Sequence, residues 1–100
     1  MRKFAIWQRP HGDPKRLEPN RTGEVQIGDF VHVYNFEESE DFTLEDAYQL
    51  LADSQPKDYH ARAIGIGDLI IVKDSEACDF QGFLVNMIGF QLVKVKGVYR

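Results

Sequence analysis

The sequence predicts an α+β fold: a mostly antiparallel sheet or partly open barrel of about five strands, with one short helix over residues 44–53. Three observations lead to this class. Residues 62–72 and 82–90 form the densest apolar, β-branched part of the chain and are expected to make the central hairpin. One segment has the apolar spacing of a helix. The predicted strands do not alternate with helices, as they would in a parallel sheet.

The residues of the central hairpin are expected to support the fold and not to bind a ligand. Gly65 and Gly67 permit a sharp turn into residues 69–72, whose continuous apolar character predicts a strand buried on both faces. These glycines are not a phosphate loop, because a third glycine and a following helix are missing. A polar connection is then expected at residues 73–81 and a return strand at 83–88. Gly89 should mark a bend or bulge, and a last strand is expected at 90–95.

The N-terminal part predicts the remaining strands. Residues 3–8 are apolar on both faces and are expected to form an interior strand. Residues 24–36 predict one long strand or two short ones, since Gly28-Asp29 interrupts the run. Their alternation puts His32 on the same face as Tyr34, as a surface histidine of the sheet. No ligand partner stands at metal-site spacing from His32.

The helix has a defined start. Thr43 is expected to be its N-cap, and Asp46 stands where the second member of a capping box belongs. One apolar stripe follows helical spacing and should face the sheet, through Leu44, Ala47, Tyr48 and Leu51.

Composition bounds the class of protein. One hundred residues, 43% hydrophobic and 28% charged, suit a single soluble domain over residues 1–100. The single cysteine, Cys78, excludes an internal disulfide framework. No signal peptide and no membrane-spanning run is recognised, so a cytoplasmic location without membrane contact is expected.

Charge is unevenly distributed along the chain. Residues 1–23 carry a net charge of +4, residues 24–58 a net charge of −9, and the remainder +1. The long loop at 9–23 is therefore basic. It is expected to be either a solvated loop or the contact surface of a nucleic-acid-binding module that uses Arg9, Lys15, Arg16 and Arg21.

Six acidic residues with no base among them surround the start of the helix. They are expected to form either a solvated rim or a surface that binds a basic partner. These residues are Glu37, Glu38, Glu40, Asp41, Glu45 and Asp46, and they are called the acidic surface below.

Catalytic chemistry has little support in the sequence. His60 stands near Asp58 and Asp68, but no nucleophile and base are placed as a catalytic pair. A cleft near Asp68 and Asn86 is the distant enzymatic alternative. We therefore expect no catalytic residues, no metal and no cofactor.

Four segments resemble the YodL-like domain family and follow its order across about 90 residues; the first is the opening strand, which matches in character. Residues 62–72 resemble its segment Arg/His-Ser-Leu-Ser-Val-Gly/Ser-Asp-Val-Val-Val, and residues 43–48 its helix start Thr-Leu-Glu-Asp-Ile-Phe/Tyr. Residues 85–90 resemble Val-Asp-Ser-Phe-Gly-Phe. The chain departs from these segments where the family has Ser or Asp, at Ala63, Gly65, Asn86 and Met87.

The resemblance implies a small protein of bacterial mobile elements or phages with no established biochemical activity. Together with the charge layout, it leads us to expect a non-enzymatic accessory protein that binds another protein through the acidic surface. Nucleic-acid binding through the basic loop is the alternative. The oligomeric state is left open.

Overall fold

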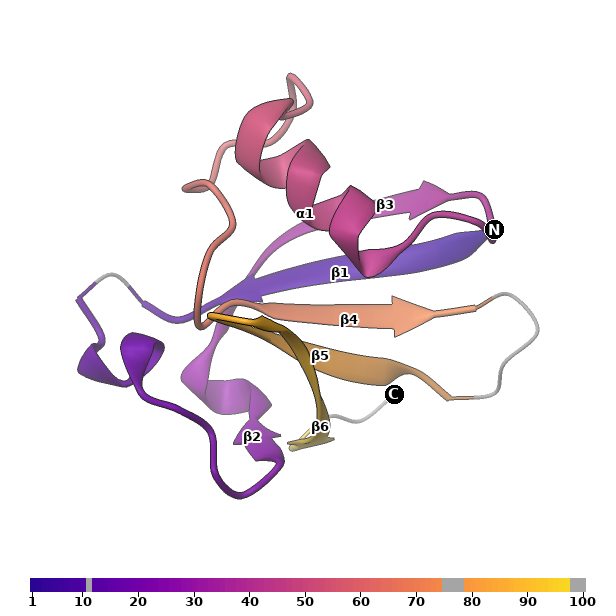
Figure 1. Ribbon diagram of the computed structural model, residues 1–100. Coiled ribbons are helices and arrows are strands. Elements are labelled where there is room, and N and C mark those ends of the chain that lie inside the picture. Colours follow the sequence, from indigo (N-terminus) through magenta and orange to yellow (C-terminus); the bar gives the residue numbers. More distant parts are fainter. Residues whose placement is uncertain (11, 75–78, 98–100) are drawn as a thin grey trace.

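The computed structural model describes residues 1–10, 12–74 and 79–97. Cys78 lies outside the described residues. The described residues form a six-stranded mixed sheet that is not closed, together with one α-helix and two short 3₁₀ helices (Figure 1). The α+β class is confirmed in outline. The strands are β1 (Arg2–Gln8), β2 (Glu24–Gln26), β3 (Val31–Glu38), β4 (Leu69–Lys73), β5 (Gln81–Asn86) and β6 (Gly89–Lys96).

The sheet order is β2-β6-β5-β4-β1-β3, which places the β4–β5 pair at the centre and β1 in the interior, as predicted. The expectation of about five mostly antiparallel strands is imprecise, because β2 pairs with β6 in parallel. Residues 24–36 make two strands that lie on opposite edges of the sheet. They are separated by the 3₁₀ helix η2 (Ile27–Asp29), where Gly28-Asp29 breaks the extended backbone.

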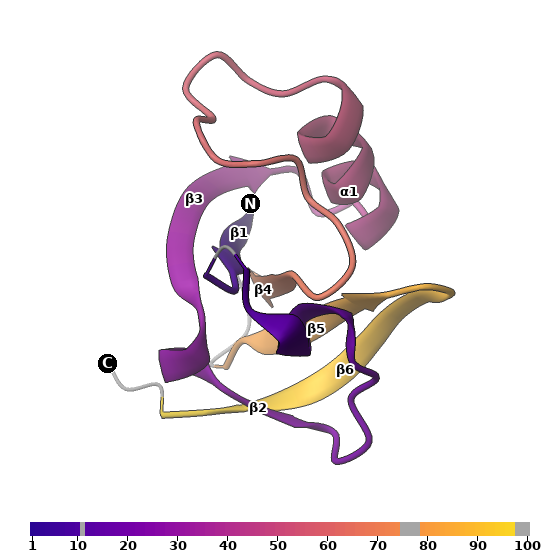
Figure 2. The same ribbon diagram turned by 90° about the vertical axis from the view of Figure 1, so that its left-hand side faces the viewer.

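The sheet is strongly curved, and Figure 2 shows β3 and β2 bending toward each other at its two edges. The inner face of this curve encloses a core cluster that includes Val25, Phe30, Leu69, Leu84 and Val93. Gly82 is part of the close packing there, since an added Cβ atom would collide with Cγ2 of Val95. The close packing of Val95 of β6 over β5 therefore requires a glycine at this position.

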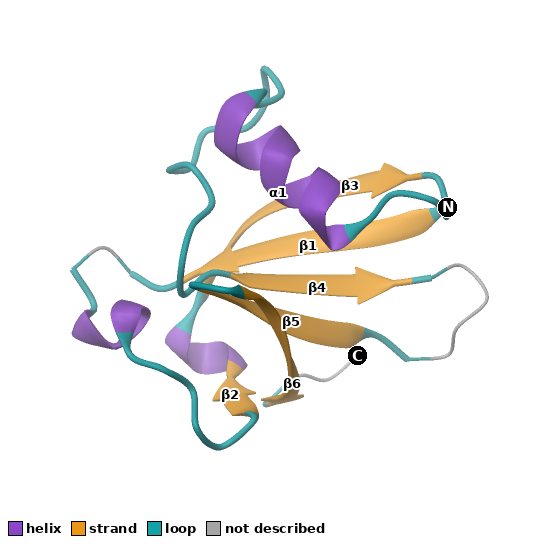
Figure 3. Ribbon diagram, in the orientation of Figure 1, coloured by secondary structure: helices purple, strands orange, loops and turns teal. Residues whose placement is uncertain are grey.

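The helix α1 (Leu44–Asp53) has the predicted bounds. Thr43 accepts a hydrogen bond from the Asp46 N–H, and the Asp46 carboxylate accepts one from the Thr43 N–H, both at 3.0 Å. Figure 3 shows the helix lying across the outer face of the sheet. Ala47 and Leu51 are fully buried there in the second core cluster, against β-strand residues such as Phe4 and Ile70.

Two strand predictions need correction. The register of β3 shifts between the partners of Ile6 and Trp7, so that Tyr34 faces Ile6 and His32 faces Trp7. This irregularity at Val33 reverses the alternation, and the predicted shared face for His32 and Tyr34 is wrong. The return strand ends at Asn86 rather than at Ile88, because residues 87–88 form the turn into β6.

Candidate functional site

The turn before β4 is built around a buried carboxylate. The Asp68 N–H donates to the Gly65 carbonyl at 3.1 Å, and Gly67 has a φ of +92°, which a glycine adopts without strain. The Asp68 side chain is 0% exposed and accepts hydrogen bonds from the Gly65 N–H at 2.8 Å and from Gln8 Nε2 at 3.1 Å. Residues Gly65 and Asp68 of the turn are therefore joined both by a backbone hydrogen bond and through the Asp68 side chain.

Arg62 completes the partners of this carboxylate. Its Nη1 lies 3.0 Å from Oδ1 and 3.2 Å from Oδ2 of Asp68, and its Nη2 donates to the Arg9 carbonyl at 3.2 Å. The Tyr59 hydroxyl donates to the Arg62 carbonyl at 2.6 Å. These contacts tie the segment between α1 and β4 to the end of β1, so we call Gln8, Tyr59, Arg62 and Asp68 the polar network.

Burial governs the titration of the polar network. Desolvation raises the pKa of Asp68 above its usual range, although the Gly65 N–H, the Arg62 charge and the Gln8 amide oppose the rise. Desolvation, and then the negative charge of Asp68, also raise the pKa of Tyr59. The Asp68 carboxylate is held by Gln8, Arg62 and the Gly65 N–H, which come from separate places in the chain. The polar network therefore has the properties of a structural brace.

The turn between β5 and β6 lies at the same end of the sheet. The Gly67 N–H donates to the Val85 carbonyl and the Val85 N–H donates to the Asp68 carbonyl, both at 2.9 Å, so the turn before β4 is joined to β5 just before the second turn begins. Met87 and Ile88 occupy the turn positions and are 86% and 96% exposed. The Ile88 N–H donates to Asn86 Oδ1 at 3.1 Å, which fixes the turn from within.

A groove of about 810 Å³ separates this hairpin tip from the basic loop. Its floor includes Ile66, Gly67 and Leu84, next to the polar network. One rim carries Asn86, Met87, Ile88 and Gln91 of the hairpin. The other rim belongs to the loop at residues 9–22, and its described members include Arg9, Lys15, Leu17, Glu18, Pro19, Asn20, Arg21 and Thr22.

The loop rim is held in place by specific contacts. Asn20 Oδ1 accepts from the Gly23 N–H and Asn20 Nδ2 donates to the Glu24 carbonyl, each at 2.8 Å, while Gln91 Nε2 donates to the Asn20 carbonyl at 3.3 Å. Asp13 caps the 3₁₀ helix η1 (Pro14–Leu17) by accepting from the Lys15 N–H. A long loop with these internal supports presents a defined surface.

Comparison with known protein families gives a match that includes residues of all six described strands and of the helix α1. The family model of the YodL-like domain matches residues 3–95, from β1 to β6. The chain belongs to the YodL-like domain family. Comparisons with curated proteins and with solved structures give no match. The predicted family is therefore confirmed.

The basic residues predicted for nucleic-acid contact have different roles in this YodL-like domain. Lys15 and Arg21 are exposed and line the groove. Arg9 also lines it but is only 11% exposed. Its guanidinium stacks 4.5 Å from the Phe30 ring centre and lies 3.6 Å from Asp13 and 3.9 Å from Asp29. Arg16 belongs to η1, and its side chain lies outside the described part of the structure.

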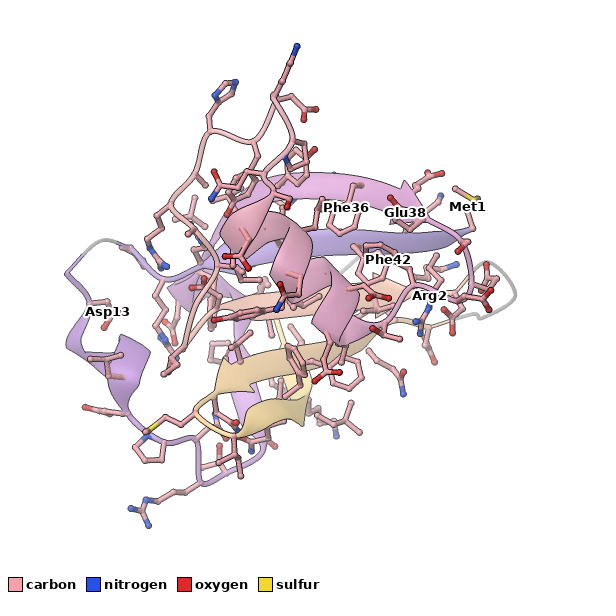
Figure 4. All side chains as sticks on the ribbon, turned by 45° about the horizontal axis from the view of Figure 1, so that its top comes forward. Met1, Arg2, Asp13, Phe36, Glu38 and Phe42 are labelled. Atoms are coloured by element: carbon pink, nitrogen blue, oxygen red, sulfur yellow. The ribbon has the colours of Figure 1, made fainter. Side chains whose placement is uncertain are left out.

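The acidic surface lies at the other end of β1, and several of its members have internal partners. Asp46 belongs to the capping box of α1, whereas Glu37 and Glu38 of β3 only stand opposite Lys3 and Arg2 of β1 in the strand register. Glu40 lies 2.8 Å from the amino group of Met1. Asp41 and Glu45 are exposed. Figure 4 shows Glu38, Arg2 and Phe42 near one another, with Asp13 of the basic loop at the opposite end.

The residues named for an enzymatic cleft are not brought together as a reacting set. His60 is exposed, Asp68 is enclosed by the polar network, and Asn86 lies on the groove rim. Within the described ranges, no group of three or more His, Cys, Asp or Glu side chains is arranged to hold a metal ion. No helix in the described part of the chain combines the length and apolar character that a membrane span requires.

The sequence interpretation missed the apolar members of this groove. Met87 and Ile88 fall inside the strand predicted at residues 83–88, and Leu17 falls inside the basic loop, for which only the charged residues carry a prediction. The signal that would have found them is Asn86 followed three residues later by Gly89, which has a φ of +147°. Asparagine and glycine are typical of turns, and a turn placed there exposes both apolar side chains.

Proposed function

We propose that this YodL-like domain is a small, non-enzymatic protein-binding module whose contact surface is the groove together with the tip of the β5–β6 hairpin. In the same proposal it acts in the cytoplasm as an accessory protein of a bacterial mobile element or phage, as the family resemblance implies.

The observation that supports this proposal most is the exposure of Met87 and Ile88. Hairpin turns are usually made by Asn, Asp and Gly, because these residues suit the backbone and water solvates them. Here two large apolar side chains occupy the turn, 86% and 96% exposed, with Leu17 of the same groove 69% exposed. Apolar side chains gathered at one exposed site are typical of protein contact surfaces. Methionine in particular adapts to the shape of a partner.

The rigid base of the groove also favours binding. Strand β5, which leads into the hairpin tip, is joined at Val85 by two backbone hydrogen bonds to the turn that Asp68 braces. An anchor held in place before contact loses little conformational entropy when a partner binds. The acidic surface gives weaker support to the same function, because Asp46 belongs to the capping box of α1 and Glu40 lies 2.8 Å from the amino group of Met1.

The proposal is tested by site-specific photocrosslinking. A photoreactive residue replaces Ile88 in one sample, and the exposed Lys57 of the loop after α1 in a control sample. After irradiation in a lysate of the source organism, we expect one discrete protein adduct from position 88. An excess of unmodified protein should compete it away, and position 57 should give no such adduct. Identical adducts from both positions, or none from position 88, would contradict the proposal.

A further inference from the structure

We infer that the groove takes an acidic, extended peptide segment of a partner protein, which inserts one or two large apolar side chains between the hairpin tip and the basic loop. This inference rests on the function proposed above and adds the chemical class of the partner. Three features of the groove support it: the positive charges on its loop rim, the apolar side chains that line it, and the side-chain amides on its hairpin rim.

The rim selects for negative charge. Lys15 and Arg21 are exposed on the loop side of the groove, and neither makes an ion pair with the described residues. Glu18 is the one acidic side chain among the described lining residues. Two exposed bases without partners beside an apolar surface favour carboxylates on the segment that binds there, since the ion pairs form as the segment docks.

The negative charge of the acidic surface does not remove the preference of the groove for an acidic segment. The two regions lie at opposite ends of β1, whose seven residues span about 23 Å. Charges separated in this way are screened in solution, because the Debye length is about 8 Å at physiological ionic strength. An acidic segment approaching the groove therefore meets chiefly the local positive charge of Lys15 and Arg21.

The groove also offers hydrogen bonds for a peptide backbone. Asn86 uses its Oδ1 within the turn, and Gln91 uses its Nε2 toward Asn20. Asn86 Nδ2 and Gln91 Oε1 make no hydrogen bond with the described residues. They leave one donor and one acceptor on the hairpin rim, which suit the carbonyl and N–H groups of an extended segment.

A peptide fits the groove better than a nucleic acid does. Single-stranded nucleic acids are bound by stacking bases on aromatic side chains. None of the described residues that line this groove is aromatic; its apolar members include Leu17, Pro19, Met87 and Ile88. Aliphatic anchors with flanking bases instead match an acidic peptide that carries Leu or Phe.

The test is a fluorescence anisotropy titration with three labelled probes. The first is a twelve-residue peptide of Asp, Glu, Leu and Phe; the second has Lys in place of every Asp and Glu; the third is a single-stranded oligothymidine. We expect the acidic peptide to bind more tightly than the other two. Lys15→Glu with Arg21→Glu should weaken that binding about tenfold or more. The matched control Lys57→Glu, a reversal of charge away from the groove, should leave it unchanged.

A second variant separates the apolar contribution from the charge. Met87→Ser with Ile88→Ser should also weaken binding of the acidic peptide about tenfold, while circular dichroism shows the fold intact. Tighter binding of the oligothymidine, equal binding of the Lys peptide, or no binding of the acidic peptide would each overturn the inference. If the adduct from position 88 still forms in those cases, the protein-binding function stands and only the acidic class of partner is lost.

Discussion

Two turns at the same end of the sheet contain side chains in unusual surroundings, and they differ in how the fold compensates for them. Asp68 is a carboxylate with 0% exposure, held by Arg62, Gln8 and the Gly65 N–H. Met87 and Ile88 are large apolar side chains that are 86% and 96% exposed, and they contribute nothing to either core cluster. Asp68 is held by partners within the fold. The Met87 and Ile88 side chains pack into neither core cluster of the described residues, and this difference separates scaffold from contact surface.

The largest effect is expected from breaking the polar network. Arg62→Met leaves the Asp68 carboxylate buried without its cation, and removal of one member of a buried pair costs about 3 kcal/mol or more. Because the Arg62 side chain is 28% exposed, we expect the lower end, a loss of about 3 kcal/mol in the free energy of unfolding. Urea denaturation measures it.

Lys57→Met is the matched control, an exposed base in the same connection between α1 and β4. It should change the free energy of unfolding by less than about 0.5 kcal/mol. Equal effects of the two variants would mean that Asp68 needs no cation, and the polar network would lose its role as a brace.

The pH dependence of stability sharpens the same point. Burial holds the folded-state pKa of Asp68 above its unfolded value of 3.8, so the folded state binds the proton more tightly. The stability that this difference contributes is full below pH 3.8 and is lost as the pH rises through the folded-state pKa. Asp68→Asn removes the titration.

The free energies of unfolding of the wild type and of Asp68→Asn are to be measured from about pH 3 to about pH 7. The wild-type value minus the variant value should be largest at the acid end and should fall as the pH rises. A difference that grows with pH would show that the native partners favour the ionised form of Asp68 over its burial.

The acidic surface contains the same contrast on a smaller scale. Asp46 accepts a hydrogen bond from the Thr43 N–H, whereas its neighbour Glu45 is exposed, and both lie in the first turn of α1. Asp46→Ala should cost about 1 kcal/mol, and Glu45→Ala less than about 0.5 kcal/mol. Because each variant removes one negative charge, the difference in thermal unfolding isolates the capping hydrogen bond. Indistinguishable melting temperatures would contradict the capping role.

The smallest effect on stability is expected at the hairpin tip. Met87→Ser with Ile88→Ser should change the free energy of unfolding by less than about 0.5 kcal/mol, because neither side chain is buried. Leu84→Ala is the control within the same hairpin, and it should cost about 2 kcal/mol or more, since Leu84 is buried in the inner core. A double Ser variant as unstable as Leu84→Ala would mean that the tip supports the fold after all.

Local patterns explain what the sequence predicted well. The Thr43–Asp46 capping box and the apolar spacing of residues 44–53 determine α1, because both signals lie within a few residues of one another. The continuous apolar run at 69–72 likewise predicts a strand buried on both faces, and Leu69 and Ile70 belong to the two different core clusters.

The sequence could not give the features that depend on distant partners. The parallel pairing of β2 with β6 joins residues about seventy positions apart, and no local pattern encodes it. Asp68 follows a glycine turn and looks like an ordinary polar turn residue until Gln8 and Arg62 are placed beside it. Met87 and Ile88 were misplaced for a different reason: apolar residues at a turn imitate the end of a strand.

The most direct test of a protein contact at the hairpin tip uses the two methionines of the chain, Met1 and Met87. Both are exposed, at 57% and 86%, and Met1 lies at the far end of β1 from the groove. The protein is labelled with ¹³C at the methionine methyl groups and observed by NMR before and after addition of a lysate of the source organism. We predict that the Met87 signal shifts or broadens while the Met1 signal does not, and that excess unlabelled protein restores it. Two signals that both stay unchanged, or that broaden alike, would contradict a protein contact at the tip.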